Sequence, residues 1–255
     1  MDAIKAATEK LRAQDDVLGV IVGGSVAYGY AIEDSDIDIM IVYSDEEYEK
    51  RLKTGDIVYF ETDSTHYEGG FIDGKATSAG FIKKVAEYGS EPAKFAYKNA
   101  IVTFDRAGGL EELVSAASRY PVARKAENIE KFYSQFQTWR WYFYEALKRG
   151  NRYLIDVSVM NYVLYAGRLI LVFNETLYPY HKWFLRELDG VKHKPDGLLL
   201  CINATIEQKK PEHVEKLYNL ISEFTQWPNE KPWSVRFMLD SELGWLSGNI
   251  PVSDL

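Results

Sequence analysis

The chain has 255 residues, a formal net charge of −8 and a hydrophobic content of 46%, which is ordinary for a folded protein with one large domain or two modest ones. The acidic balance argues against a polynucleotide partner, because phosphate backbones are held mostly by clustered lysine and arginine. The single cysteine, Cys201, excludes an internal disulfide. With no apolar run recognised as a membrane span, we expect a cytoplasmic protein.

The N-terminal part of the chain alternates helical and strand patterns. Apolar, β-branched runs are typical of buried strands, and apolar side chains at spacings of three and four are typical of helices packed on a sheet. The order of these patterns predicts an antiparallel or mixed sheet with helices on one side. We expect strands over residues 17–22, 36–43, 56–61, 67–77 and 100–104, and helices over residues 2–14, 44–54 and 78–88.

From residue 109 onward the strand-like alternation disappears. The clearest helices are expected over residues 127–149 and 152–174, and the second is apolar round most of its circumference, which favours a central place in a bundle. The fold class is therefore α+β, with an α/β domain over residues 1–108 and a helical bundle over residues 109–255. Further helices are expected over residues 181–189, 198–208, 211–226 and 233–247.

The strongest functional signal lies between residues 17 and 43. Gly24 and Ser25 follow the first strand, where a glycine lets the backbone approach a ligand and a helix start presents free N–H groups to phosphate. Asp36 and Asp38 head the second strand, and its period of two places them on one face. Neighbouring carboxylates repel unless a cation lies between them, and magnesium prefers carboxylates together with substrate phosphates. The stretch predicts a metal–nucleotide site, against the plainer alternative of a capped helix and solvated aspartates.

Gly-Gly-Ser, a gap of ten residues and Asp-x-Asp leading into an apolar strand resemble the signature of the DNA polymerase β-type nucleotidyltransferase superfamily. The stretch looks similar to the small bacterial antibiotic nucleotidyltransferases, which act on aminoglycosides and lincosamides. Ala27, Gly29 and the Ser-Asp-Ile-Asp run at residues 35–38 match that form, whereas Tyr28 stands where an arginine is often found. The motif-bearing part covers residues 15–105, and the bundle shows a much less specific resemblance.

This resemblance implies a third carboxylate on a later strand. Asp73 is our choice, with Glu68 as the first alternative and Asp63 behind it. The alternative that Asp73 is only part of a hairpin turn stays open, because Asp-Gly is a hairpin signal by itself. Lys182 follows a proline-bearing turn, and it either reaches the nucleotide triphosphate or is a lysine that extends its amine to solvent at a helix start.

We therefore expect a magnesium-dependent nucleotidyltransferase. It would move a nucleoside monophosphate, AMP from ATP, onto a hydroxyl of a small acceptor such as an aminoglycoside-like antibiotic, and release pyrophosphate, which implies a role in antibiotic resistance. Asp36, Asp38 and Asp73 would hold two Mg²⁺ ions. Gly24, Ser25 and Lys182 would bind the nucleotide, and Glu145 is a candidate general base from the bundle.

Three alternatives stay open, and the first of them belongs to another functional class. A nucleotide-binding, antitoxin-like interaction protein would keep the fold for docking, and an exposed apolar patch on the bundle would favour it. A protein AMPylator would use a protein hydroxyl as the acceptor. An RNA or tRNA terminal transferase is disfavoured by the acidic charge. The sequence leaves a homodimer open.

Overall fold

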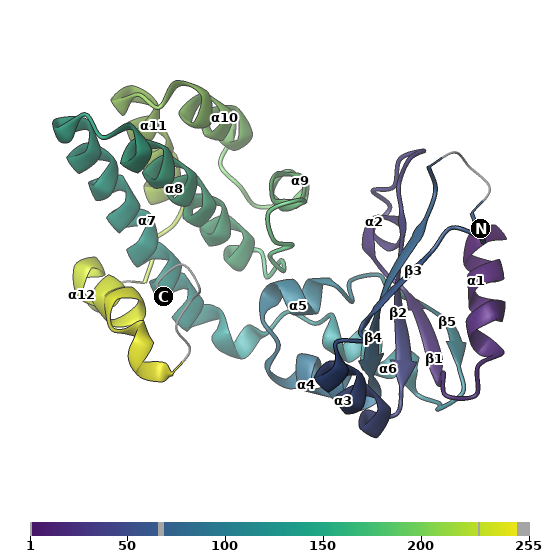
Figure 1. Ribbon diagram of the computed structural model, residues 1–255. Helices are drawn as coiled ribbons and strands as arrows, with labels where there is room; N and C mark the ends of the chain where they lie inside the picture. The colour runs from purple at the N-terminus through teal and green to yellow at the C-terminus, as the bar shows by residue number, and fades with distance from the viewer. Residues whose placement is uncertain (1, 66–68, 229, 249–255) are drawn as a thin grey trace. The chain divides into compact units, whose positions relative to one another are not determined.

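The structure is a computed structural model that describes residues 2–65, 69–228 and 230–248 (Figure 1). The chain divides into two compact units, Met1–Tyr120 and Pro121–Leu255. The expected boundary between residues 108 and 109 falls inside the first unit. Helix α6 (Leu110–Ala117) belongs there because it packs on α4 (Ala79–Tyr88) and on the last strand of the sheet.

The first unit contains the mixed sheet that the sequence predicts, so the α+β fold class is confirmed. Its strands are β1 (Gly19–Val22), β2 (Ile37–Tyr43), β3 (Val58–Glu61), β4 (Ile72–Ser78) and β5 (Ile101–Asp105). They lie in the order β3-β4-β2-β1-β5. The β2–β4 pair is parallel and all other pairs are antiparallel, including the expected β3–β4 hairpin. The hairpin therefore brings β4 back beside β2, running in the same direction.

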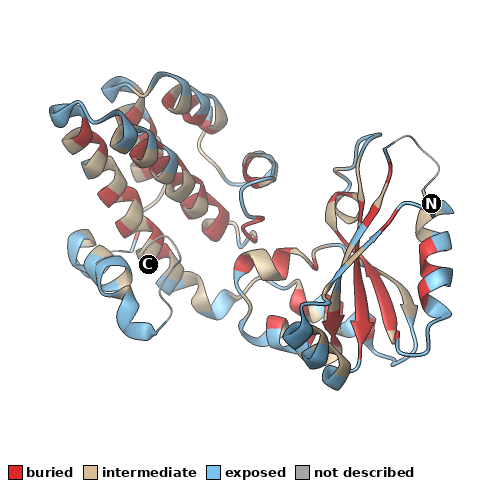
Figure 2. Cartoon of the chain, viewed as in Figure 1, coloured by how far each residue is buried: buried red, intermediate tan, exposed pale blue. Residues whose placement is uncertain are grey.

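Helices cover both faces of this sheet, so the expectation of helices on one side was wrong. Leu11 of α1 (Asp2–Arg12) shares a buried cluster with Val20 and Val22 of β1. Ile21, between them, points to the opposite face and packs with Ile82 of α4 and with side chains of α6. All four residues of β1 are buried, and a strand with two apolar faces needs cover on both (Figure 2).

The helix ends of the first unit follow the expected capping chemistry. Helix α3 (Asp45–Thr54) begins at Ser44, whose hydroxyl accepts a hydrogen bond from the Glu47 N–H at 3.2 Å, and it ends at Gly55 in the left-handed conformation. Helix α2 (Gly24–Tyr28) is a single turn directly after β1. Helix α5 (Glu91–Phe95) was missed in the sequence, although Ser90 caps it and Pro92 lies in its first turn.

The second unit is helical, as expected. Helix α7 (Lys125–Arg149) ends at Gly150 in the left-handed conformation and pairs along its length with α8 (Arg152–Phe173). The expected helix over residues 233–247 is broken into three short segments. The remaining elements are η1 (Val122–Arg124), α9 (Phe184–Gly190), α10 (Leu198–Gln208), α11 (Pro211–Phe224), α12 (Trp233–Phe237), η2 (Met238–Glu242) and η3 (Gly244–Ser247).

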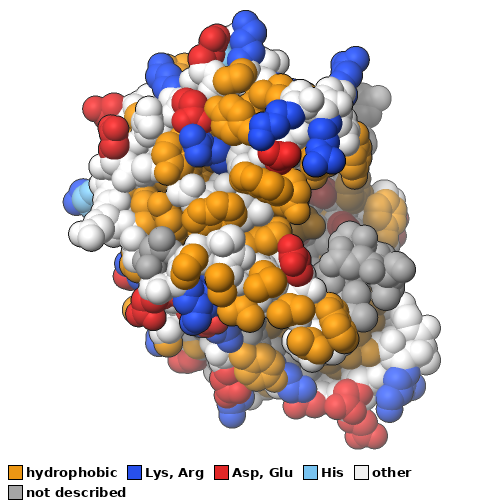
Figure 3. All heavy atoms as spheres, turned by 90° about the vertical axis from the view of Figure 1, so that its left-hand side faces the viewer, with side chains coloured by type: hydrophobic (Ala, Val, Ile, Leu, Met, Phe, Trp, Pro, Cys, Tyr) orange, Lys and Arg blue, Asp and Glu red, His pale blue; other side chains and the backbone are white. Residues whose placement is uncertain are grey.

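Helix α8 lies at the centre of the second unit. It is long and apolar enough to cross a membrane by length and composition, which the sequence analysis did not recognise, but 56% of its most apolar window is buried inside the unit. That burial is typical of a core helix, as its all-round apolar pattern predicted. Apolar side chains also gather on the face shown in Figure 3, and exposed examples in this unit are Trp141, Tyr153 and Trp245.

Candidate functional site

The turn after β1 places backbone groups against a carboxylate. Gly23 donates its N–H to the backbone oxygen of Asp38 at 2.9 Å, which ties the turn to the start of β2. Gly24 has a φ of +60°, a conformation that favours glycine. Its backbone lies directly against the Asp38 side chain, with no room for a Cβ between them. The two halves of the Gly-Ser and Asp-x-Asp motif therefore touch.

Ser25 is a buried hydroxyl in this turn. It is 5% exposed, and its Oγ makes no hydrogen bond to the described part of the chain. A buried hydroxyl without a partner costs roughly 1–3 kcal/mol, so such atoms are usually satisfied. The role of Ser25 in binding a nucleotide stays a prediction, in which a phosphate oxygen would be the missing acceptor.

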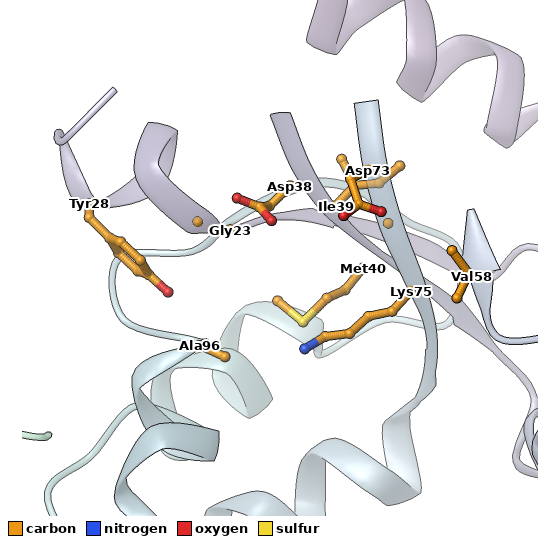
Figure 4. Close-up of a pocket in the computed structure, with 11 residues that line it drawn as sticks. Gly23, Tyr28, Asp38, Ile39, Met40, Val58, Asp73, Lys75 and Ala96 are labelled. Atoms are coloured by element: carbon orange, nitrogen blue, oxygen red, sulfur yellow. The ribbon is translucent and has the colours of Figure 1, made fainter. Parts of the chain in front are cut away.

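Asp38 and Asp73 lie side by side across the parallel β2–β4 pair, where they are register partners. Neighbouring strands are about 4.8 Å apart, so the two carboxylates share one face of the sheet at close range (Figure 4). Asp38 is half-buried and Asp73 is exposed. Their shared face is the one that carries Met40, which packs towards α4 and α6. The sheet thus presents two hard oxygen donors beside the Gly24 turn.

Asp36 lies one residue before β2 and is half-buried. Among residues 2–65, 69–228 and 230–248, no three histidine, cysteine, aspartate or glutamate side chains are grouped so that they could hold a metal ion. The three-acid assignment therefore stays a prediction. Two carboxylates with substrate phosphates are nevertheless a usual magnesium ligand set, and Asp38 and Asp73 fit it.

Asp38 and Asp73 line a pocket of about 430 Å³. Of the residues expected in the site, the pocket brings together Gly24, Asp38 and Asp73, whereas Asp36 and Ser25 are outside its lining. The volume lies within the range of pockets that hold drug-sized ligands. The described residues that line it are Gly23, Gly24, Tyr28, Asp38, Ile39, Met40, Val58, Asp73, Gly74, Lys75 and Ala96.

Of the two alternative third acids, the structure describes Asp63 but not Glu68. Asp63 is exposed, and its carboxylate is 3.4 Å from the amine of Lys10. Gly74, which follows Asp73, packs its backbone against Ile39 and leaves no space for a Cβ. Asp73 is therefore a strand residue facing the pocket, and its Asp-Gly pair does not form the hairpin turn.

Two further candidates belong to the second unit. The Lys182 amine lies 5.2 Å from the centre of the Trp183 ring, a cation–π contact. Glu145 is paired with Lys148, with its carboxylate oxygen 2.6 Å from the amine, and this hydrogen bond lowers the pKa of Glu145. A carboxylate with a lowered pKa is a weaker proton acceptor, which argues against Glu145 as the general base.

Tyr28 occupies the position where the resemblance leads one to expect an arginine. Its hydroxyl donates to the backbone oxygen of Phe95 at 3.2 Å, and its ring centre lies 4.8 Å from that of Phe95. Tyr28 thus joins α2 to α5 and lines the pocket without supplying a charge. The cation in the lining is Lys75, which the sequence analysis missed. The available signal was its spacing of two from Asp73, which places both side chains on one face of β4.

Comparison with known proteins agrees with this geometry. Residues 4–103 match the family model of a nucleotidyltransferase domain, and residues 91–184 match a domain of unknown function, DUF4037. No curated protein matches the chain. The chain is also similar to a solved nucleotidyltransferase-like protein from Exiguobacterium sibiricum 255-15, with 11% identity and a TM-score of 0.47, over 96% of this chain and 78% of that one.

The match over residues 4–103 to a nucleotidyltransferase domain agrees with the resemblance that the Gly-Ser and Asp-x-Asp motif predicts. The expected enzyme class, a nucleotidyltransferase, is thereby confirmed. Such a domain takes a nucleotide as its substrate and transfers a nucleoside monophosphate.

Proposed function

We propose that the protein is a magnesium-dependent nucleotidyltransferase that transfers AMP from ATP to a hydroxyl of a small-molecule acceptor. The observation that carries the proposal is the pairing of Asp38 with Asp73 across β2 and β4, beside the Gly24 turn and inside one pocket. Two oxygen donors beside a phosphate-binding turn are what a metal-bound triphosphate requires.

The chain's own groups have separate roles in this reaction. The N–H of Gly24 and the Oγ of Ser25 would donate hydrogen bonds to the β- and γ-phosphates. Asp36, Asp38 and Asp73 would hold Mg²⁺, which when bound stabilises both the attacking and the leaving oxygen. The acceptor oxygen forms a bond to the α-phosphorus and releases its proton to solvent, while the bond from the α-phosphorus to the oxygen that bridges to the β-phosphorus breaks and pyrophosphate leaves with that electron pair. Lys182 is proposed as a further nucleotide-binding residue.

The acceptor is proposed to be a small hydroxylated molecule. An aminoglycoside-like antibiotic is one member of that class, and its positive charges complement a chain with a net charge of −8. Modification of such a compound would confer antibiotic resistance. The single cysteine is compatible with a reducing compartment, so we place the protein in the cytoplasm.

The test is an assay of pyrophosphate release. Purified protein is incubated with Mg²⁺, with ATP, GTP, CTP or UTP in turn, and with a panel of aminoglycosides, lincosamides and proteins. We expect acceptor-dependent release that is lost in the Asp38→Asn, Asp73→Asn double variant. Release that survives the double variant would refute the proposed site, and labelling of a protein in the panel would identify an AMPylator instead.

The antitoxin-like alternative is favoured by a different observation. The described residues contain no group of three potential metal ligands, and apolar side chains gather on the face shown in Figure 3. A binding protein of this kind would bind Mg-ATP but release no pyrophosphate with any acceptor. Equilibrium binding measured beside the turnover assay separates this outcome from the enzyme.

A further inference from the structure

Lys75 lies inside the pocket, on the same strand face as Asp73. It follows Asp73 by two residues, and its register partner on β2 is Met40. A strand advances about 3.3 Å per residue, so Lys75 starts two residues further along β4 than Asp73 and on the same face, and its side chain is exposed. Figure 4 shows its side chain extending past Met40, on the side of the pocket that Ala96 lines.

The Lys75 amine has no ion-pair partner among the residues that the structure describes. Within the described ranges, neither an ion pair nor a hydrogen bond joins its amine to another residue, although two carboxylates line the same pocket. Lysines on protein surfaces commonly pair with nearby acids, as Lys10 does with Glu61. An exposed amine that lines the pocket and has no partner among the described residues is available to a ligand of negative charge.

A triphosphate in this pocket requires such a cation. It carries several negative charges, and Asp38 and Asp73 add two more carboxylates. The other phosphate-binding groups, at Gly24 and Ser25, are neutral donors, and Tyr28 supplies no charge. Among the described lining residues, Lys75 is the one cation.

We propose that the Lys75 ammonium binds a phosphate oxygen of the nucleoside triphosphate and is the cation of this site. The inference rests on the proposed function, because it takes the triphosphate as the ligand. A charge-assisted hydrogen bond from an ammonium group is stronger than one from a neutral donor and acts as a point charge on phosphate. The competing explanation is structural, with the aliphatic stem of Lys75 covering Met40 and its amine only extending to solvent.

Two variants separate these explanations. Lys75→Met keeps an apolar stem of similar length and removes the charge, whereas Lys75→Arg keeps the charge. Isothermal titration calorimetry with Mg-ATP and with inorganic pyrophosphate, in the absence of an acceptor, measures their affinities. We expect Lys75→Met to weaken both ligands by about 10- to 100-fold, the loss of one charged hydrogen bond, and Lys75→Arg to recover most of that affinity.

Lys83→Gln is the matched control, because Lys83 is an exposed lysine of α4 outside the pocket lining. It should bind both ligands as the wild type does. Thermal unfolding of each variant checks that the domain is folded. The inference is overturned if folded Lys75→Met keeps wild-type affinity for Mg-ATP and pyrophosphate, or if Lys75→Arg is as weak as Lys75→Met.

Failure of the proposed function gives a different pattern. A wild-type protein that binds neither Mg-ATP nor pyrophosphate would refute the nucleotide site itself, and Lys75 with it. If the Asp38→Asn, Asp73→Asn double variant loses turnover while Lys75→Met keeps its affinity, the proposed function stands and the role of Lys75 alone is rejected.

Discussion

Gly24 and Asp38 are in such close contact that a Cβ built on Gly24 would lie 1.7 Å from the Asp38 Oδ2 atom. No side chain fits at that distance, so any other residue at position 24 forces the carboxylate away. The glycine therefore has two functions, since it adopts a φ of +60° and leaves space for a charged side chain of the site.

Gly24→Ala should abolish activity by displacing Asp38. It should also lower the free energy of unfolding by about 1–2 kcal/mol, the cost of a left-handed conformation for a residue with a Cβ. Urea unfolding and the pyrophosphate assay measure the two effects. Gly29→Ala is the control, because Gly29 has a φ of +72° and nothing within 4 Å of a built Cβ. Equal activity losses in the two variants would show that backbone strain, and not the displacement of Asp38, is responsible.

Asp73→Asn should lower the turnover rate by more than about 100-fold while leaving the domain at least as stable in the absence of magnesium. The first effect follows from losing a charged group at the reacting centre, and the second from relieving like-charge repulsion with Asp38. The pyrophosphate assay measures the turnover rate. Thermal melting with and without Mg²⁺ measures stability and metal binding, because an ion that binds the folded state raises the melting temperature. Asp34→Asn removes an exposed acid from the loop before β2 and should change neither property. A magnesium-dependent shift that persists in Asp73→Asn would remove this residue from the metal site.

The local parts of this site were accessible from the sequence. Gly24, Ser25 and Asp38 lie within one short stretch, where a strand, a glycine turn and a second strand follow each other, so residue types and spacing suffice to predict their proximity. The helices expected over residues 44–54 and 127–149 likewise end where α3 and α7 end, directly before Gly55 and Gly150. Asp73 was predicted only by resemblance, because nothing in its own segment states which strand lies beside it.

The missed features depend on contacts between distant segments. Parallel pairing of β2 with β4 requires the chain to pass through α3 and β3 first, and sequence periodicity does not specify that pairing. The place of Lys75 in the pocket can be recognised only once β4 is known to lie beside Asp38. The cover on both faces of β1 was in principle readable, because all residues of β1 are apolar or glycine. Helix α5 is too short for periodicity to reveal it.

Glu61 should make the first unit sensitive to acid. Burial alone would raise the pKa of this carboxyl, but hydrogen bonds from Lys10 and from the Ser64 hydroxyl lower it below its ordinary value of 4.5. A pKa that is lower in the folded state gives stability that is present above pH 4.5 and is lost as the pH falls through the folded-state pKa. Urea unfolding between pH 3 and 7 should show a shallower pH dependence for Glu61→Gln than for the wild type.

Glu61→Gln should also lower the free energy of unfolding by about 1–3 kcal/mol at neutral pH, because it replaces a charged hydrogen bond of a buried side chain. Glu46→Gln is the matched control, since Glu46 is an exposed acid in the first turn of α3. If both variants show the wild-type pH dependence, Glu61 is not the group that links acid to unfolding.

Glu215 joins α7 to α11 through three hydrogen bonds. Arg140 donates to both of its oxygens, at 2.9 and 2.6 Å, and the Tyr144 hydroxyl donates at 2.6 Å. Glu215→Gln should lower the stability of the second unit by about 1–2 kcal/mol, a value reduced because the pair is partly exposed to solvent. Denaturant unfolding followed by tryptophan fluorescence measures it. A loss no larger than that of the exposed-site variant Glu223→Gln would mean that these bonds add nothing.

The same contact predicts behaviour at alkaline pH. Burial, and then the hydrogen bond to Glu215, raise the pKa of Tyr144 to about 12 from its ordinary value of 10. A pKa raised on folding gives stability that is complete below pH 10 and is lost as the pH rises towards 12. Tyr144→Phe should therefore flatten the alkaline stability profile, whereas Tyr153→Phe, at an exposed position, should not. A tyrosinate titration without a component near pH 12 that disappears in Tyr144→Phe would contradict this assignment.

Strands β2 and β4 each have a neighbouring strand on both sides, and this has a consequence for ligand selection. Amide protons of interior strands generally exchange with solvent only when a domain opens globally, so we expect slow exchange for β2 and β4, which carry Asp38, Asp73 and Lys75. The face of β2 and β4 that carries these side chains is therefore already formed before a nucleotide binds. Substrate choice should accordingly depend on the segments that surround these two strands.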